Sequence, residues 1–150
     1  MTEQKIPAPV YPPTLWLNNL AIRMALDTFM RAHLPGFSYR ITSSNRTTES
    51  NARAGGAVNS AHVHGLAMDF TLINSDGSKI PEAQAKILYT STVAPLWGAG
   101  FTEFEASSTG EGYHIHVNLP RTYSQTNSKI AIGLTIGLAV VTVGSVITLS

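Results

Sequence analysis

Two short segments of the sequence carry side chains that can bind a metal ion. The first, SAHVHGLAMD, contains His62 and Asp69, and the second, GYHIHVN, contains His114 and His116. Residues two apart on a β-strand point to the same face, so the second segment presents both imidazoles together. Histidine and aspartate are ligands that zinc accepts, and three protein ligands leave a fourth position for water. The pattern therefore predicts a catalytic metal site shared by two distant segments.

The helices that must help to position these side chains are indicated by apolar periodicity. Between Thr14 and Ala32 apolar residues recur at helical spacing, and Thr14 can cap the first turn, which predicts a helix with one core-facing side. Pro81 opens a second helix that extends to about Ala94. We expect a third, short helix within residues 47–54.

Strands are indicated by alternating stretches that are rich in β-branched and aromatic residues. Four such stretches occur, at residues 37–42, 66–73, 101–105 and 113–119. With the helices they predict an α+β domain over residues 14–120, built on a small antiparallel sheet with flanking helices.

The overall composition excludes several classes of function. A chain of 150 residues is long enough for one domain with a hydrophobic core. The formal net charge is +1, so no nucleic-acid partner is predicted. The sequence contains no cysteine, which excludes disulfides, thiolate catalysis and cysteine-ligated zinc.

The two ends of the chain differ from the domain. Residues 1–13 are polar and rich in proline, which predicts an extended arm. Residues 121–129 form a polar tether to residues 130–149, IAIGLTIGLAVVTVGSVITL, which carry no charge. At helical rise this run is about 30 Å long, the thickness of a bilayer's hydrocarbon core, and it predicts a transmembrane helix. A pair of buried strands is the alternative, because Val, Ile and Thr favour strands.

A membrane helix at this position predicts where the protein resides. The N-terminus lacks a basic start followed by a long apolar core, so no secretory signal is predicted and the anchor is expected at the C-terminal end. Arg121 and Lys129 precede the apolar run, which favours a domain in the cytoplasm or inside a virion. We expect a single-pass protein in contact with the lipid bilayer of a virion or of a host inner membrane. Gly133 and Gly137 form a GxxxG pair that would let two such helices self-associate.

Several motifs of the domain occur together in a known order. They are TSSNR at 42–46, Asn51, Gly55–Gly56, the pattern Ser-x-His-x-x-Gly-x-Ala-x-Asp at 60–69, and His-x-His at 114–116. This order resembles the M15 zinc peptidases, which include D-Ala-D-Ala carboxypeptidases and phage L-alanyl-D-glutamate endopeptidases and share their fold with the hedgehog signalling domain. The resemblance covers about residues 14–120 and leaves out the arm and the apolar run.

The resemblance implies a role for each matched residue. It implies Zn²⁺ as the cofactor, with the metal ligands at His62, Asp69 and His116. His114 resembles the second histidine of the family, which lies beside the reaction centre and stabilises the transition state. Arg46 resembles the arginine that faces the carboxylate or carbonyl of the substrate. Ser60 resembles the serine that opens the motif, where it holds the loop or touches the substrate.

The proton acceptor is the point at which this sequence departs from the family. A zinc-activated water needs a carboxylate to take its proton. Many family members place an acid three residues before the last histidine, a position occupied here by Tyr113. The nearest acid is Glu111, which we predict to be the catalytic base, with Glu105 and Glu103 in reserve.

Two functions follow from these expectations. The first is a zinc peptidase that cleaves a peptidoglycan peptide at a bond involving D-amino acids, as a phage endolysin bound to a membrane or as a virion enzyme of entry. The alternative is a catalytically inactive, zinc-stabilised module that binds peptidoglycan or a protein at a membrane. Tyr113 supports the alternative, whereas Arg46 and His114 argue against it, because a structural zinc needs neither.

Overall fold

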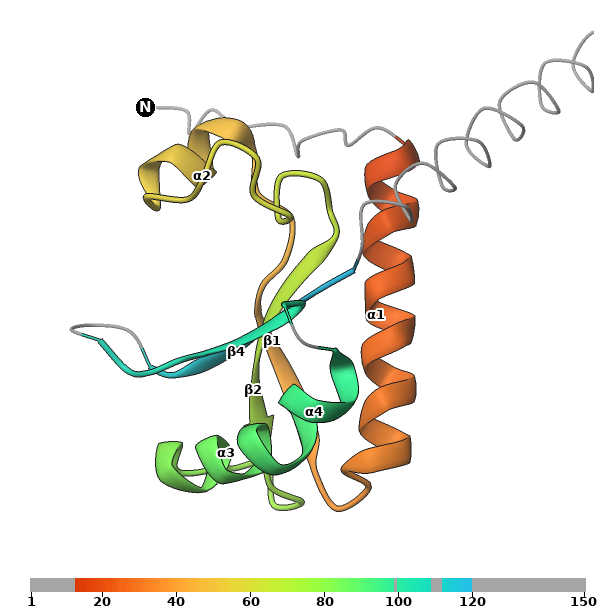
Figure 1. Cartoon of the computed structure of the whole chain (residues 1–150), viewed down its shortest axis with the longest axis vertical. Helices are drawn as coiled ribbons and strands as arrows, with labels where there is room; N and C mark the ends of the chain where they lie inside the picture. Colours follow the sequence, from red (N-terminus) through yellow and green to blue (C-terminus); the bar gives the residue numbers. More distant parts are fainter. Residues whose placement is uncertain (1–12, 99, 109–111, 120–150) are drawn as a thin grey trace, which may run out of the picture.

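A computed structural model describes residues 13–98, 100–108 and 112–119 of the chain. These residues form an α+β unit in which helices cover a four-stranded antiparallel sheet, which confirms the predicted α+β class and the antiparallel sheet (Figure 1). Along the chain the elements are α1 (Pro13–His33), β1 (Ser38–Ser43), α2 (Thr48–Arg53), β2 (Ala67–Ile73), α3 (Glu82–Leu88), a π-helical turn η1 (Tyr89–Val93), α4 (Ala94–Trp97), β3 (Thr102–Glu105) and β4 (His114–Asn118).

The sheet has the strand order β1-β2-β4-β3, so β2 and β4 lie at its centre although 40 or more residues separate them in sequence. Every residue of β2 is buried, in agreement with its position between β1 and β4. The β2–β4 register pairs Asp69 with His116 and Phe70 with Ile115. The β3–β4 register pairs Glu103 with His116.

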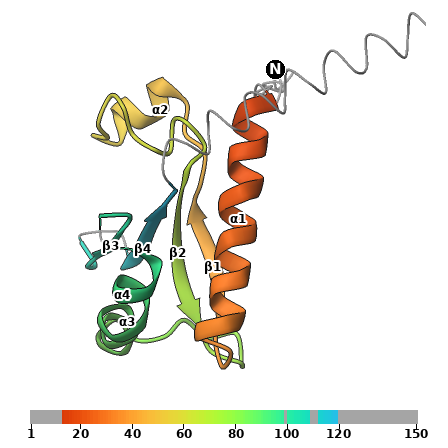
Figure 2. The same ribbon diagram turned by 45° about the vertical axis from the view of Figure 1, so that its right-hand side comes forward.

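The alternation of side chains divides the sheet into two chemically different faces. One face carries apolar residues, among them Phe70, Ile115 and Val117, and these belong to the core cluster with Ile22 and Leu26 of α1. The helix α1 runs along this face (Figure 2). The opposite face carries the polar residues that alternate with them, and the predicted metal ligands of β2 and β4 are among these. The core and the candidate site therefore lie on opposite sides of one sheet.

The helical segment α3–η1–α4 closes the core between α1 and β3. The Trp97 ring lies 5.4 Å from the Phe29 ring of α1, and the Tyr89 ring lies 5.6 Å from the Phe104 ring of β3. The sequence predicted that this helix ends near Ala94, but α4 continues it to Trp97. Pro95 has no N–H to donate to the preceding turn, and that turn is π-helical.

Several predictions fall on parts of the chain that lie outside the described residues. They concern the arm before residue 13, the tether 121–129, the apolar run 130–149 with its glycine pair Gly133 and Gly137, and the predicted base Glu111. Within the described part of the chain, no helix is both long enough and apolar enough to cross a bilayer.

Candidate metal centre

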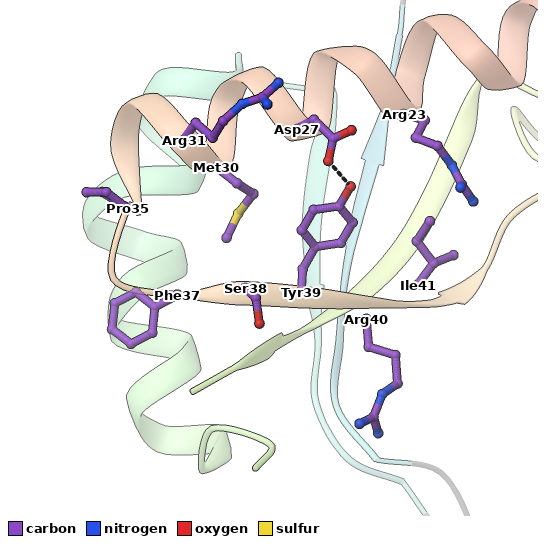
Figure 3. Close-up of a pocket in the computed structure, with 10 residues that line it drawn as sticks. All are labelled: Arg23, Asp27, Met30, Arg31, Pro35, Phe37, Ser38, Tyr39, Arg40 and Ile41. Atoms are coloured by element: carbon purple, nitrogen blue, oxygen red, sulfur yellow. Dashed lines mark hydrogen bonds between the residues drawn. The ribbon is translucent and has the colours of Figure 1, made fainter. Parts of the chain in front are cut away.

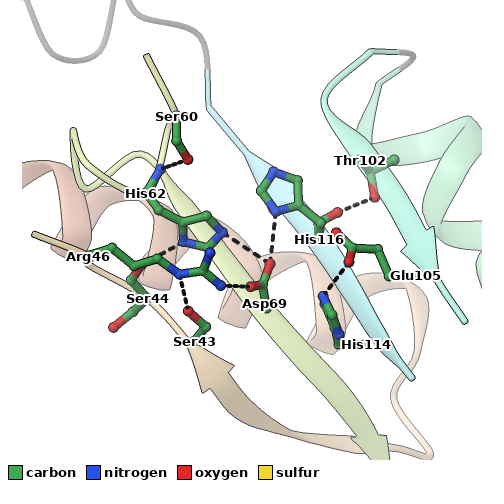
Figure 4. Close-up of polar contacts among 10 residues, drawn as sticks. All are labelled: Ser43, Ser44, Arg46, Ser60, His62, Asp69, Thr102, Glu105, His114 and His116. Atoms are coloured by element: carbon green, nitrogen blue, oxygen red, sulfur yellow. Dashed lines mark hydrogen bonds and ion pairs between the residues drawn. The ribbon is translucent and has the colours of Figure 1, made fainter. Parts of the chain in front are cut away.

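The three predicted metal ligands meet at one point on the polar face of the sheet (Figure 4). Their ligand atoms all lie within 4.8 Å of one another. Asp69 Oδ1 is 2.8 Å from Nδ1 of His116, its partner across the strands, and 3.2 Å from Nε2 of His62. Antiparallel pairing of β2 and β4 therefore brings together two ligands that are 47 residues apart.

His62 is held by the loop that precedes β2. Its backbone N–H donates to Ser60 Oγ at 3.3 Å, so this serine supports the loop, which is one of the two roles predicted for it. The loop turns back toward β2 at Gly65, whose φ is +68°. A Cβ atom at Gly65 would lie 2.8 Å from the carbonyl oxygen of Leu15 in α1. Both the backbone angle and this close approach require glycine here, which gives a physical reason for the glycine of the motif.

The hydrogen bond on the far side of the His62 ring determines which nitrogen faces the cluster. Nδ1 lies 2.6 Å from the carbonyl oxygen of Ser44, which can only accept, so Nδ1 carries a proton. In the neutral ring Nε2 then has a lone pair, and that lone pair points at the Asp69 carboxylate 3.2 Å away. Two acceptors at this distance need a cation between them, either a proton on Nε2 or a metal ion. An imidazole anchored to a carbonyl in this way is the usual arrangement of a metal ligand, so the residues present fit a metal ion.

Asp69 is the electrostatic centre of the cluster. Its side chain is almost fully buried, and burial alone would raise its pKa, but the close imidazoles of His116 and His62 outweigh that effect and lower the pKa well below the usual range. The carboxylate is therefore ionised at neutral pH. Its second oxygen lies 3.4 Å from Nη2 of Arg46, so the predicted substrate-binding arginine contacts the cluster directly.

A β-bulge places a further residue beside Asp69. The register of β1 with β2 shifts between Ile41 and Ser43, so that Ser43 lies opposite Asp69. Bulges of this kind commonly re-aim a side chain next to a functional site. Arg46 Nε donates to Ser43 Oγ at 3.2 Å, which orients the guanidinium toward the carboxylate.

Two acids of β3 face the two histidines of β4 across the strand pair. Glu105 pairs with His114, and its Oε2 lies 3.0 Å from His114 Nε2, while Glu103 pairs with His116. The two acids, both histidines, Ser60, His62, Asp69 and Arg46 line one cavity of about 370 Å³. His114 is thus beside the cluster, as predicted, and its imidazole is bound by an acid of the neighbouring strand.

A second cavity, of about 270 Å³, adjoins the first and shares Arg46, Asp69 and His114 with it. Its other cation is Lys79, whose ammonium group donates to the carbonyl oxygen of Tyr113 at 3.2 Å and lies 4.2 Å from the centre of that ring. Sequence analysis did not select Lys79, because neither its spacing nor its neighbours form a motif. Two cations beside the cluster create a region suited to an anionic group of a ligand.

Tyr113 occupies the position at which many family members carry an acid, and it serves the core instead. Its ring stacks on Phe104 with centres 5.6 Å apart, and its hydroxyl donates to the carbonyl oxygen of Ile80 at 2.8 Å. Because it precedes His116 by three residues, an odd number, strand alternation directs it to the opposite face. Any acid that serves the cluster must therefore come from another position.

A larger cavity, of about 700 Å³, lies between α1 and β1 and is lined by none of the predicted site residues (Figure 3). At its centre the Tyr39 hydroxyl donates to Asp27. Burial and this hydrogen bond raise the pKa of Tyr39 to about 12. Its wall also carries Arg23, Arg31 and Arg40, and it contains no group of side chains arranged as metal ligands.

Comparison with known proteins relates the chain to one family. A family model described as Peptidase M15 matches residues 17–106, more than half of the 150 residues. The matched part contains His62 and Asp69 and ends before His116. No curated protein matches the chain.

Proposed function

Because the chain belongs to the peptidase M15 family, as its motifs predicted, we propose that it is a zinc-dependent peptidase that hydrolyses peptidoglycan stem or cross-link peptides. The observation that carries this proposal is the cluster of His62, Asp69 and His116, with the His62 lone pair turned toward the carboxylate by the Ser44 carbonyl. Two imidazoles with one carboxylate favour zinc among the divalent ions.

The chain's own groups would bind and orient the substrate beside the metal. Zinc at such a site supplies Lewis acidity, which polarises a carbonyl group and makes a water molecule more acidic. Arg46 presents a planar guanidinium that can hold a carbonyl or a carboxylate oxygen. Lys79, across the adjoining cavity, adds a second positive charge for an anionic peptide terminus. Glu105 holds the imidazole of His114 beside the same space, where a hydrogen-bonding side chain can stabilise a developing oxyanion.

The proton acceptor has two candidates with different support. Glu111 remains the candidate that the sequence predicts. The described residues add Glu103, which lines the same cavity as the cluster and lies opposite His116 in the strand register. The Glu103 side chain makes no hydrogen bond or ion pair with the described part of the chain, whereas the Glu105 carboxylate is engaged with His114. A carboxylate without a competing partner is available to accept a proton from water.

Digestion of purified peptidoglycan by the full chain in mild detergent, with and without a chelator, tests the proposal. We expect chelator-sensitive cleavage, and the product masses would separate release of a terminal D-Ala from cleavage within a peptide. Changing the true proton acceptor to glutamine should lower kcat about 100-fold or more while zinc content is retained. Glu111→Gln and Glu103→Gln are compared with the control Glu49→Gln, which lies in α2 and lines neither cavity.

The alternative, a zinc-stabilised binding module, is favoured by one observation, the use of Tyr113 as a core residue at the position of the family's acid. If zinc-loaded protein leaves sacculi of several wall types intact but sediments with them, the peptidase proposal is wrong and the binding module replaces it. Cleavage that survives both glutamine substitutions would leave the peptidase in place and refute both assignments of the proton acceptor.

The setting of this activity is also a proposal. The uncharged run 130–149 supports a C-terminal membrane anchor, and a wall hydrolase with such an anchor suits a bacteriophage, as an endolysin or as a virion enzyme of entry. Flotation of the full chain with lipid vesicles at alkaline pH tests the anchor, because an integral protein stays with the lipid under those conditions. Chain that remains at the bottom of the gradient would refute it.

A further inference from the structure

The helix α1 is apolar on two opposite sides between Trp16 and Leu26. Ile22 and Leu26 are fully buried in the core. On the outer side, Trp16, Leu20 and Met24 follow one another at intervals of four residues, which places them in one row. Their exposed fractions are 60%, 39% and 60%. A helix that is apolar on both sides is normally covered on both, so the outer row indicates a contact that the domain itself does not provide.

The outer row continues into an apolar cavity of about 720 Å³ between α1 and α4. Met24 belongs to both the row and the cavity, and Leu96 of α4, which is 55% exposed, lines its other side. Leu119, the last residue that the structure describes, also lines this cavity. The chain therefore leaves the domain at the same apolar surface, defined here as Trp16, Leu20, Met24 and Leu96.

We propose that this apolar surface rests on a lipid bilayer. The proposal builds on the anchor proposed above: ten residues, 120–129, separate Leu119 from the uncharged run. Ten residues with random-coil dimensions would span about 18 Å, whereas a domain of about 100 residues is about 35 Å across. The face that bears Leu119 must therefore stay close to the bilayer that holds the anchor.

The composition of the surface suits an interface between lipid and water. Tryptophan favours the level of the headgroups, and leucine and methionine favour the acyl chains beneath. Arg23 and Arg31 are exposed on the same helix, where they can meet anionic headgroups. The only acid of α1, Asp27, accepts a hydrogen bond from Tyr39.

This orientation has a consequence for the metal centre. The side chains of Asp69 and His116 project from the sheet face opposite to α1, because they alternate with Phe70 and Ile115 of the core. A bilayer against the outer side of α1 leaves the two cavities beside the cluster facing away from the membrane.

The chain contains two tryptophans, Trp16 and Trp97, which makes the contact measurable. The full-length Trp97→Phe protein, with Trp16 as its only tryptophan, is placed in phosphatidylcholine–phosphatidylglycerol vesicles with or without brominated acyl chains. Bromine quenches indole fluorescence only at short range. We expect loss of most of the Trp16 emission, and a smaller loss for Trp97 in the matched Trp16→Phe protein, because its indole is partly buried and donates to the Asn118 carbonyl.

A second variant separates the surface from the anchor. Leu20→Ser with Met24→Ser in the Trp97→Phe background should relieve the quenching of Trp16 while the chain still floats with the vesicles. If the Trp97→Phe protein floats but its Trp16 emission is equal in brominated and plain lipid, the proposed contact of the apolar surface with lipid is wrong and the proposed anchor is retained. If the protein does not float with the vesicles, both the anchor and the lipid contact are wrong. Unquenched Trp16 with cross-links between α1 helices would assign the surface to a second copy instead of lipid.

Discussion

Replacement of Asp69 by asparagine is the sharpest test of the metal centre, because it changes one charge and almost no volume. The carboxylate lies 2.8 Å from His116 Nδ1, 3.2 Å from His62 Nε2 and 3.4 Å from Arg46 Nη2. Asparagine keeps one oxygen but replaces the other with an amide NH₂ group, which then lies next to either an imidazole or the guanidinium. A charged ligand is lost, so zinc affinity should fall by at least about 100-fold, the upper range for residues that merely support a ligand.

The magnitude follows from mass action. At a free zinc concentration 100 times the dissociation constant of the wild type, binding adds about 2.7 kcal/mol to the free energy of unfolding. A variant with a 100-fold weaker site gains only about 0.4 kcal/mol at the same concentration. For a domain of about 100 residues the difference of about 2.3 kcal/mol corresponds to about 9 °C in Tm.

The assay is thermal unfolding of metal-free and zinc-loaded protein, with the zinc-induced change in Tm as the readout. Comparing each variant with its own metal-free form removes any effect of the substitution on the apo protein. Asp76→Asn is the matched control, since Asp76 is an exposed acid that bonds only to Ser78 among the described residues. An Asp69→Asn protein that keeps the full zinc-induced shift would refute the assignment of Asp69 as a ligand.

Two further predictions concern positions outside the ligand set. Gly65→Ala should lower the free energy of unfolding by about 2 kcal/mol or more, because the residue has positive φ and its Cβ would meet the Leu15 carbonyl. Urea unfolding measures the effect. The control is Gly36→Ala, where the added atom meets nothing within 4 Å. Equal stability of the two variants would contradict this account of the loop. Tyr39 has a pKa raised from 10.0 to about 12, first by burial and then by its bond to Asp27, so the folded state favours the neutral phenol. Its contribution to stability is complete below pH 10 and is lost as pH rises toward 12. Between these values the free energy of unfolding should fall more steeply in the wild type than in Tyr39→Phe, and parallel curves would show that Tyr39 contributes nothing.

Most of the elements were predictable because they depend on local patterns. Apolar periodicity located α1, and alternation located all four strands. The predicted cap was wrong, because α1 begins at Pro13 and Thr14 lies within its first turn. The extension of α4 to Trp97 was not predictable, because contacts with Phe29 and with the Asn118 carbonyl stabilise it. These partners lie far away in the sequence, so the local amino-acid composition does not predict the contacts.

The sequence by itself determined which side chains could bind a metal and that His114 and His116 share a face. Only the tertiary structure decided that His116 lies opposite Asp69, that Glu103 and Glu105 come to the same cavity, and that Lys79 stands beside Arg46. The physical reason is strand register. Alternation determines which side of a strand a residue faces, but only long-range pairing determines which residue lies opposite to it on the next strand.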